Sequence, residues 1–289
     1  SLSRNKLIYD LAEDMGISSM SSQWVDVVLN GEVVGNYLLC EHVRIGNTRV
    51  DITDWDDIAE DVAKAIYKAN KKSMSKEERD ELAELMEANM DWVTDGLVTY
   101  KSKTYKISDY YNLPNANGGY LLECFGTESP CFTSGSGLGV CISKPEGIGK
   151  EMLSGIQTYY SAFEAAAQAD DFCTEYNGQK IRYSDLADAE SFAKGFLLNE
   201  IFQNQDFLRC STYMYKEVDE KLVFGPIWDM DMSSDNSSNV YSHNKWVCFT
   251  RGNITEMLKD PAFLKIIYDT YKEYRYTAIA DMLKPDGDI

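Results

Sequence analysis

The chain has 289 residues and a formal net charge of −19, because 47 Asp and Glu residues outnumber 28 Lys and Arg residues. A protein that grips phosphate backbones needs a basic surface, so this balance argues against nucleic-acid binding. No run approaches the roughly 18 apolar residues of a membrane-spanning helix, so we do not expect membrane insertion.

Histidine and cysteine usage leaves carboxylates as the main candidates for chemistry. The only histidines are His42 and His243, which argues against zinc hydrolases and other mechanisms that need several histidines. None of the seven cysteines forms a C-x-x-C pair, and most lie in apolar runs such as "YLLCE" and "GVCIS". A cysteine in such a run is usually a small buried hydrophobe, so we expect neither a zinc site nor a redox dithiol.

The first predicted elements are a helix and a hairpin. In "RNKLIYDLAEDMG" apolar residues recur every fourth position, and Gly16 suits the end of a helix. The next stretch, "WVDVVLNGEVVGNYLLCEHV", has Asn30-Gly31 between two apolar runs, which is a strong hairpin signal. Together they predict a small α+β lobe over about residues 1–50.

The middle of the chain predicts a helical insertion and then two strands. Residues 51–95 are acidic, and Ser75 with Glu78 forms a capping-box pattern before an apolar stripe of helical spacing. "GGYLLECF" predicts a strand, and "TSGSGLGVCISKPEG" predicts a glycine-rich hairpin tip that enters another strand. The tip lacks the G-K-[ST] of a phosphate-binding loop, so we do not interpret it as one.

The last part alternates helices and one hairpin. Residues 149–170 and about 187–204 have amphipathic helix patterns, and "STYMYKEVDEKLVFGPIWDMD" predicts two strands around a turn at residues 219–221. A polar loop and further helix follow. We expect a single domain over residues 1–289, in which residues 96–289 carry the functional segments.

Three carboxylates flank the predicted hairpin. Asp206 lies in the loop before it, while Asp229 and Asp231 end its second strand and project from one face of an extended chain. Closing the hairpin therefore brings Asp206 close to Asp229 and Asp231. Protein kinases use this order, with a catalytic-loop Asp before the hairpin and a metal-binding Asp after it. They place an amide ligand five residues after the first Asp, where this chain has Ser211.

The front of the chain follows the same order by analogy. In kinases a regulatory helix and two strands lead to the hinge against which adenine lies. Here the hairpin ends in "CEHV", so the backbone from Glu41 to Val43 is the predicted contact for the base.

Calcium is the competing interpretation of the acidic loop. Oxygen-bearing side chains alternate there as in an EF-hand, at Asp229, Asp231, Ser233 and Asp235. However, Ser234 stands where that loop needs Gly, and Val240 stands where it needs a bidentate Glu. Calcium is therefore the less favoured metal.

Six segments in order resemble the CotH spore-coat kinases: "RNKLIYDLAEDMGI", "VVLNGEVVGNYLLCEHVRIGNTRVDI", "GGYLLE", "ISKPEG", "FLLNEIFQNQDFLRCSTYMYK" and "LVFGPIWDMDM". The resemblance spans about residues 4–236. It implies an α+β, atypical protein-kinase-like, two-lobed fold of mixed helices and antiparallel hairpins. It also implies ATP with Mg²⁺ or Mn²⁺ as cofactors, Ser/Thr phosphorylation of proteins, and a spore-coat, cell-surface or cellulosome setting.

The resemblance assigns roles to individual residues. Asp206 matches the catalytic aspartate and Asp229 the metal-binding aspartate, with Asp231 and Ser211 as further metal contacts. Lys144 matches a family lysine that pairs with phosphate or with Glu123. Arg4, at the start of the first helix, also matches and is expected to face phosphate.

Two departures from the family favour an alternative function. Family members carry a lysine-bearing strand before the first helix, so the small lobe is expected to be incomplete at its N-terminal side. After Asp231 this chain has "MSSDN" instead of an apolar-glycine segment. The alternative is a non-catalytic surface or scaffold module with at most a structural metal. For a kinase, the charge of −19 suits a basic, serine-rich protein substrate.

Overall fold

The computed structural model describes residues 3–126, 130–234, 236 and 245–284, and confirms the expected α+β class. Within these residues ten α-helices accompany small antiparallel sheets. None of the described helices has the length and apolar character needed to cross a membrane.

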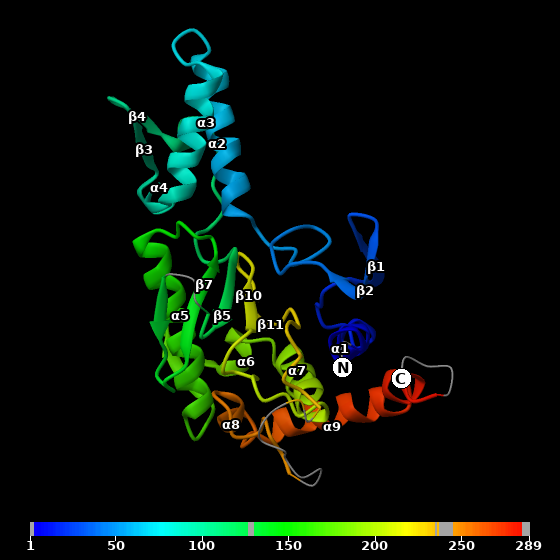
Figure 1. Cartoon of the computed structure of the whole chain (residues 1–289). Coiled ribbons are helices and arrows are strands. Elements are labelled where there is room, and N and C mark those ends of the chain that lie inside the picture. The colour runs from blue at the N-terminus through cyan, green and yellow to red at the C-terminus, as the bar shows by residue number, and fades with distance from the viewer. Residues whose placement is uncertain (1–2, 127–129, 235, 237–244, 285–289) are drawn as a thin grey trace.

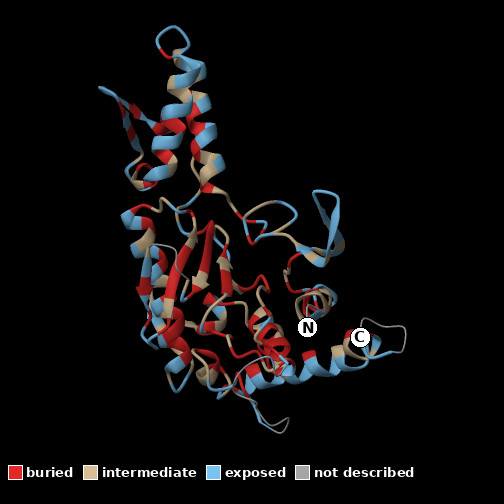
Figure 2. Ribbon diagram, in the orientation of Figure 1, coloured by how far each residue is buried: buried red, intermediate tan, exposed pale blue. Residues whose placement is uncertain are grey.

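The predicted N-terminal helix and hairpin are both present. They are α1 (Ser3–Asp14), β1 (Ser22–Leu29) and β2 (Glu32–Cys40). Gly16 ends α1 with a φ of 68°, and Asn30 (52°) with Gly31 (87°) supplies the two positive φ values of a tight hairpin turn. The hairpin projects from the body with exposed side chains along most of its length (Figures 1 and 2).

The helical insertion stands above the central sheet in Figure 1. Its elements are α2 (Trp55–Asn70), α3 (Lys76–Ala88), α4 (Asp91–Asp95), β3 (Leu97–Tyr100), β4 (Lys103–Lys106) and the 3₁₀ turn η1 (Ile107–Asp109). The predicted capping box forms at Ser75 and Glu78. Two hydrogen bonds anchor the insertion to the sheet region: Trp55 Nε1 donates to the Gly118 carbonyl (2.8 Å), and the Met90 amide donates to the Gly147 carbonyl (2.8 Å).

The central sheet has five antiparallel strands. They are β5 (Tyr120–Cys124), β6 (Cys131–Thr133), β7 (Gly139–Lys144), β10 (Thr212–Lys216) and β11 (Leu222–Phe224). The spatial order is β11-β10-β5-β7-β6, so the late hairpin β10–β11 pairs with β5 from the middle of the chain. Most side chains of β5 are fully buried, which makes it the centre of the core.

Helices surround this sheet (Figure 1). The remaining elements are α5 (Lys150–Gln168), β8 (Cys173–Tyr176), β9 (Gln179–Arg182), α6 (Tyr183–Leu186), α7 (Ala189–Ile201), α8 (Ile254–Met257), α9 (Pro261–Arg275) and α10 (Ala278–Met282). The predicted helices at 149–170 and 187–204 correspond to α5 and α7. Helix α9 packs along α7 and extends towards α1.

A chain of aromatic contacts links the edge of the sheet to the loop after α7. Consecutive ring centroids lie 5.5–5.8 Å apart along Phe132, Tyr160, Phe163, Phe192, Phe224 and Phe207. Such tilted and edge-on pairs add stabilisation beyond the burial of their area. Because Phe207 directly follows Asp206, the core fixes the position of that loop.

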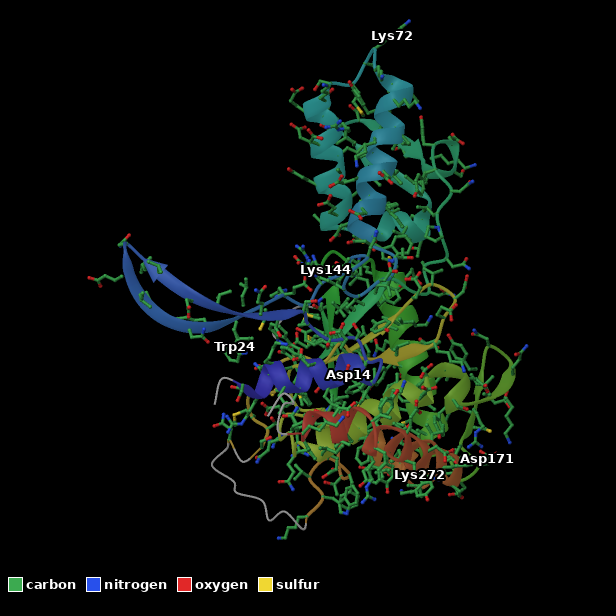
Figure 3. All side chains as sticks on the ribbon, turned by 90° about the vertical axis from the view of Figure 1, so that its right-hand side faces the viewer. Asp14, Trp24, Lys72, Lys144, Asp171 and Lys272 are labelled. Atoms are coloured by element: carbon green, nitrogen blue, oxygen red, sulfur yellow. A yellow bond between two sulfur atoms is a disulfide. The ribbon has the colours of Figure 1, made fainter. Side chains whose placement is uncertain are left out.

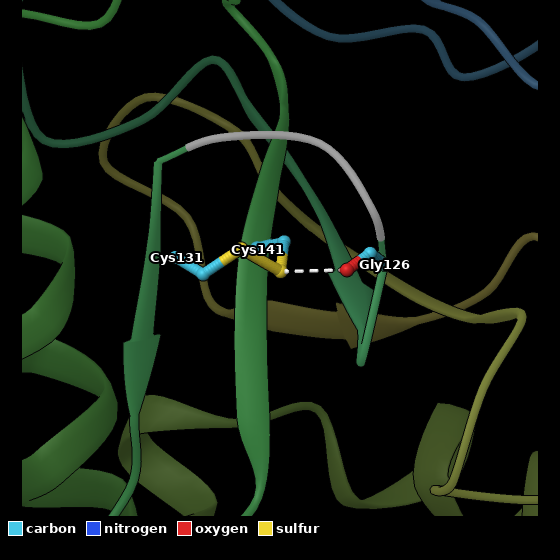
Figure 4. Close-up of a disulfide and its surroundings, with 3 residues drawn as sticks. All are labelled: Gly126, Cys131 and Cys141. Carbon is cyan, nitrogen blue, oxygen red and sulfur yellow. Dashed lines mark hydrogen bonds between the residues drawn. A yellow bond between two sulfur atoms is a disulfide. The ribbon is translucent and has the colours of Figure 1, made fainter.

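One pair of cysteines forms a bond that the sequence analysis did not predict. Cys131 of β6 and Cys141 of β7 are opposite each other and form a disulfide (Figure 4). Cys141 Sγ also lies 3.3 Å from the Gly126 carbonyl oxygen. Strand β6 and the hairpins β3–β4 and β8–β9 were not predicted either, because each has only three or four residues per strand.

The glycine-rich segment forms the expected hairpin tip between β6 and β7. The Ser134 amide donates to the Leu138 carbonyl (2.8 Å) and closes the turn. The buried carboxylate of Glu164 in α5 accepts from the Gly135 amide (2.7 Å) and from Ser136 Oγ (2.7 Å). The polar groups of this loop are therefore engaged with α5.

We predict that Gly195→Ala destabilises the protein. A Cβ at this position in α7 would lie 2.1 Å from a ring carbon of Phe224 in β11, so overpacking should lower the free energy of unfolding by about 1–3 kcal/mol. Gly155→Ala in α5 is the control, because nothing lies within 4 Å of its Cβ. It should raise stability by about 0.5–1 kcal/mol, the usual gain in a helix interior. Urea unfolding measures both, and equal effects would contradict the prediction.

Candidate functional site

The loop after α7 holds Asp206 by its backbone. The Asp206 amide donates to Asn204 Oδ1 (3.1 Å), and its carbonyl accepts from the amides of Arg209 (2.8 Å) and Cys210 (3.1 Å). Asn204 is itself buried and donates to Asn199 Oδ1 of α7 (2.8 Å). The loop is therefore rigidly attached to α7, while the Asp206 side chain remains partly exposed.

The β10–β11 hairpin brings Ser211 and Asp229 together, as its closure predicts. Ser211 Oγ donates to Asp229 Oδ2 at 3.2 Å, across 18 residues of sequence. Both residues have left-handed backbones, with φ values of 49° and 51°. Such backbones are costly outside glycine and tend to occur at functional sites.

The carboxylates of Asp206 and Asp231 lie close enough to Asp229 for their charges to raise its pKa. Burial raises the pKa of Asp229, and the charge of Asp231 raises it further, while the hydrogen bond from Ser211 partly offsets both. The charge of Asp206 also contributes to the raised pKa. The ionised form of Asp229 is therefore unfavourable at this position. A bound cation would offset the repulsion from Asp231 and Asp206.

Helix α1 contributes two residues that the sequence interpretation missed. The Asp229 amide donates to Tyr9 Oη (3.1 Å), and the Met230 amide donates to Asn5 Oδ1 (2.9 Å). Burial raises the pKa of Tyr9, and the charges of Asp229 and Asp231 add to the effect, so its hydroxyl keeps its proton. The available signal was the four-residue spacing of Asn5 and Tyr9, which places both on one helix face.

The predicted adenine contacts lie beside the acidic loop. The ring of His42 packs 6.0 Å from that of Trp228, the residue before Asp229. His42 Nδ1 lies 2.8 Å from the Val43 carbonyl, and Glu41 forms an ion pair with Arg49 at 2.7 Å. The Glu41 side chain is thus used within the protein, and its role in binding a base stays a prediction for the backbone.

Lys144 lies away from the carboxylates. It pairs with Glu146 (2.9 Å) and Asp56 (3.4 Å) at the end of β7, opposite Leu121. Along β5, Leu121 is three residues from Cys124, the partner of Thr212, which corresponds to about 10 Å. Figure 3 shows Lys144 between the insertion and the sheet. There it borders a cavity of about 370 Å³ that is also lined by Arg44 and Arg49.

Arg4 lies nearer the acidic loop than Lys144 does. Its Nη2 is 3.5 Å from the Ser234 carbonyl oxygen, three residues beyond Asp231. The structure therefore gathers Asp206, Ser211, Asp229 and Asp231, with Arg4 at the edge of the group.

The residues present could hold a metal ion that is also bound by the phosphates of a nucleotide, but they do not form a complete ligand set by themselves. Within the described residues, no group of three or more His, Cys, Asp or Glu side chains could hold a metal ion. Mg²⁺, however, is usually bound by one or two carboxylates together with substrate phosphates, and Asp229 with Asp231 meets that requirement.

The calcium-loop alternative gains no support from the described part of the loop. Ser233 is fully buried, and its Oγ donates to the Met230 carbonyl (2.6 Å). The other residues on which that alternative depends, Asp235 and Val240, lie outside the described residues, as does His243.

Cys210 is a further neighbour that the sequence interpretation missed. Burial and the adjacent charge of Asp206 raise the pKa of its thiol to about 11, so it remains protonated at neutral pH. Nothing in the sequence around Cys210 predicts its contact with Asp206.

Comparison with known proteins identifies one family. The family described as "CotH kinase protein" matches residues 1–113 and 146–282, which is most of the chain. No curated protein matches the chain. The matched ranges include Asp206, Ser211, Asp229 and Asp231, whereas Lys144 lies between them.

We predict that Asp229→Asn raises the melting temperature of the metal-free protein at neutral pH. A carboxylate with a raised folded-state pKa costs stability as the pH rises from its unfolded-state pKa through the raised one, and asparagine accepts a left-handed backbone. An increase of roughly 1–3 °C is expected. The increase should shrink as the pH is lowered through the raised pKa, because the wild-type carboxyl then takes up a proton.

Asp219→Asn is the matched control for this measurement. Asp219 also has a positive φ (59°), but hydrogen bonds from Asn117 and Asn115 lower its pKa. Its ionised form is therefore favourable, and the substitution should lower the melting temperature. Equal shifts for the two variants would show that the carboxylates near Asp229 do not repel one another.

Proposed function

The chain belongs to the CotH kinase family, and on this premise we propose that it is a protein Ser/Thr kinase that uses ATP with Mg²⁺ or Mn²⁺. The observation that carries the proposal is the meeting of two separate segments. The Asp206 loop and the D-x-D of Asp229 and Asp231 are joined by the Ser211 hydrogen bond at the open end of one hairpin, opposite its turn. Phosphoryl transfer requires such a pair of acidic positions.

Each acidic residue has a distinct proposed task. Asp206, partly exposed on a rigid loop, accepts a hydrogen bond from the substrate Ser or Thr hydroxyl and orients it towards the γ-phosphate. Asp229 and Asp231 hold the cation, and Ser211 keeps the Asp229 carboxylate in place. A divalent cation bound there would neutralise phosphate charge during the transfer.

Nucleotide placement follows from the neighbouring segments. The backbone of Glu41 to Val43 is the proposed base contact, because the His42 ring packs against Trp228 beside Asp229. Arg4 is the proposed contact for phosphate from the α1 side. Lys144 pairs with Glu146 and Asp56 away from this site, so its role in binding the nucleotide rests on the family resemblance alone.

The charge distribution supports a basic protein substrate. Beside the insertion, a cavity of about 480 Å³ is lined by Asp56, Glu84, Glu87 and Glu146 with the single cation Lys144. Burial and neighbouring acids raise the pKa values of Asp56 and Glu87, which indicates excess negative charge that a basic segment would relieve.

The disulfide supports a location outside a reducing compartment. The Cys131–Cys141 bond needs oxidising conditions to persist. The family is linked to the spore coat, and we propose the spore coat or the bacterial cell surface as the site of action.

A non-catalytic scaffold is the second candidate. It is favoured by Ser211, which stands where kinases have an amide ligand, and by the lack of a three-residue metal cluster in the described part of the chain.

We predict that wild-type protein binds ATP only with Mg²⁺ or Mn²⁺ and phosphorylates a basic, serine-rich peptide. Asp206→Asn should keep nucleotide binding but lose about 10²–10⁴-fold in kcat, whereas Asp229→Asn should lose metal-dependent binding itself. Calorimetry and a peptide phosphorylation assay separate these effects, with Asp219→Asn as the control. Calcium binding without nucleotide binding would instead support the scaffold, and a fully active Asp206→Asn would refute the catalytic assignment.

A further inference from the structure

The segment that carries Asp229 is fastened to the N-terminal part of the chain, which lies more than 200 residues away in sequence. The Ile227 amide donates to the Ser18 carbonyl (2.8 Å). The next two hydrogen bonds go to side chains of α1, from the Asp229 amide to Tyr9 Oη and from the Met230 amide to Asn5 Oδ1. Three backbone amides that follow β11 therefore donate to α1 or to the turn after it.

These contacts hold Asp229 in a conformation that its own backbone disfavours. A left-handed φ of 51° at a non-glycine residue persists only where the surroundings impose it. Tyr9 is 1% exposed, so loss of its hydroxyl would leave the Asp229 amide without this acceptor in a buried place. On the opposite side, Ser211 contacts the carboxylate of the same residue. The backbone and the side chain of Asp229 are thus held from two directions.

Helix α1 is in turn held by the C-terminal part of the chain. Tyr274 Oη of α9 donates to the Met15 carbonyl at the end of α1 (3.1 Å), and α1 also contacts α10. The position of Asn5 and Tyr9 is therefore set by helices α9 and α10 and not only by the exposed β1–β2 hairpin.

We propose that Asn5 and Tyr9 are positioning residues that fix the Asp229 carboxylate for the metal-bound nucleotide. The inference rests on the proposed kinase function. Neither residue touches the reacting groups. Their effect is carried by the backbone amides of Asp229 and Met230, so a helix displacement at α1 would release the carboxylate without any change at Asp229 itself.

The first test measures the metal-free protein. Hydrogen exchange of the peptide that carries residues 227–232 is followed by mass spectrometry in wild type, Tyr9→Phe and Asn5→Ala. Each variant lacks one acceptor, so the exchange rate should rise about fivefold, the factor that one hydrogen bond contributes. Tyr159→Phe is the matched control, because it removes a partly buried hydroxyl that donates to the Leu186 carbonyl and contacts neither α1 nor the Asp229 segment. It should leave this peptide unchanged.

The second test measures the Mg²⁺ concentration that half-saturates ATP binding. Tyr9→Phe and Asn5→Ala should require about tenfold more Mg²⁺, as loss of a residue that orients a metal ligand usually does. Asn5→Asp keeps an acceptor oxygen and should restore the wild-type exchange rate, although its added charge beside Asp229 excludes it from the Mg²⁺ comparison. KM for the peptide should stay unchanged in Tyr9→Phe and Asn5→Ala. A purely structural role would instead lower the melting temperature of Tyr9→Phe and Tyr159→Phe alike, with no change in the Mg²⁺ requirement.

The outcomes separate the two proposals. If wild-type protein binds no Mg²⁺–ATP, the kinase function fails, and the exchange data alone then decide whether α1 fixes the Asp229 backbone. If wild type binds Mg²⁺–ATP but Tyr9→Phe and Asn5→Ala exchange and bind as wild type does, the positioning role is overturned.

Discussion

The unfavourable position of the Asp229 carboxylate, partly buried and beside the charges of Asp231 and Asp206, is the constraint on which the site depends. Each carboxylate is best solvated when it is far from the others, yet the hairpin closes them onto one site. Packing elsewhere in the fold keeps the carboxylates there. A close-packed apolar core is rigid, so it fixes the position of the loops attached to it.

Two parts of the chain provide the restraint. On one side, the aromatic contacts from Phe132 to Phe207 join the sheet, α5 and α7 to the loop that carries Asp206. On the other side, α1 accepts the backbone hydrogen bonds of the Asp229 segment. The carboxylates lie where these two parts meet, so their arrangement is sensitive to any displacement of α1 relative to the Asp206 loop.

The sequence reveals those parts of this arrangement that depend on local chemistry. The Asn30-Gly31 turn, the Ser75–Glu78 capping box and the α5 and α7 helices follow from residue types at short spacing, and they are present. The approach of Ser211 to Asp229 follows from the closing of one hairpin. The roles of the site residues themselves remain predictions.

The rest depends on pairings between distant segments, which no local pattern encodes. The disulfide needs the β6–β7 register, in which Cys131 faces Cys141, and β6 has only three residues. The contact of Tyr9 with Asp229 spans 220 residues. Lys144 illustrates the same limit, because a family motif predicts a phosphate or Glu123 as its partner but not its ion pair with Asp56 across 88 residues.

The left-handed backbone at Asp229 also restricts how this chain can evolve. Glycine, asparagine and aspartate adopt that conformation most readily, so few replacements there leave the fold undisturbed. The genetic code connects aspartate to asparagine and to glycine by single base changes. A gene copy can therefore lose this carboxylate in one step and still encode a folded protein.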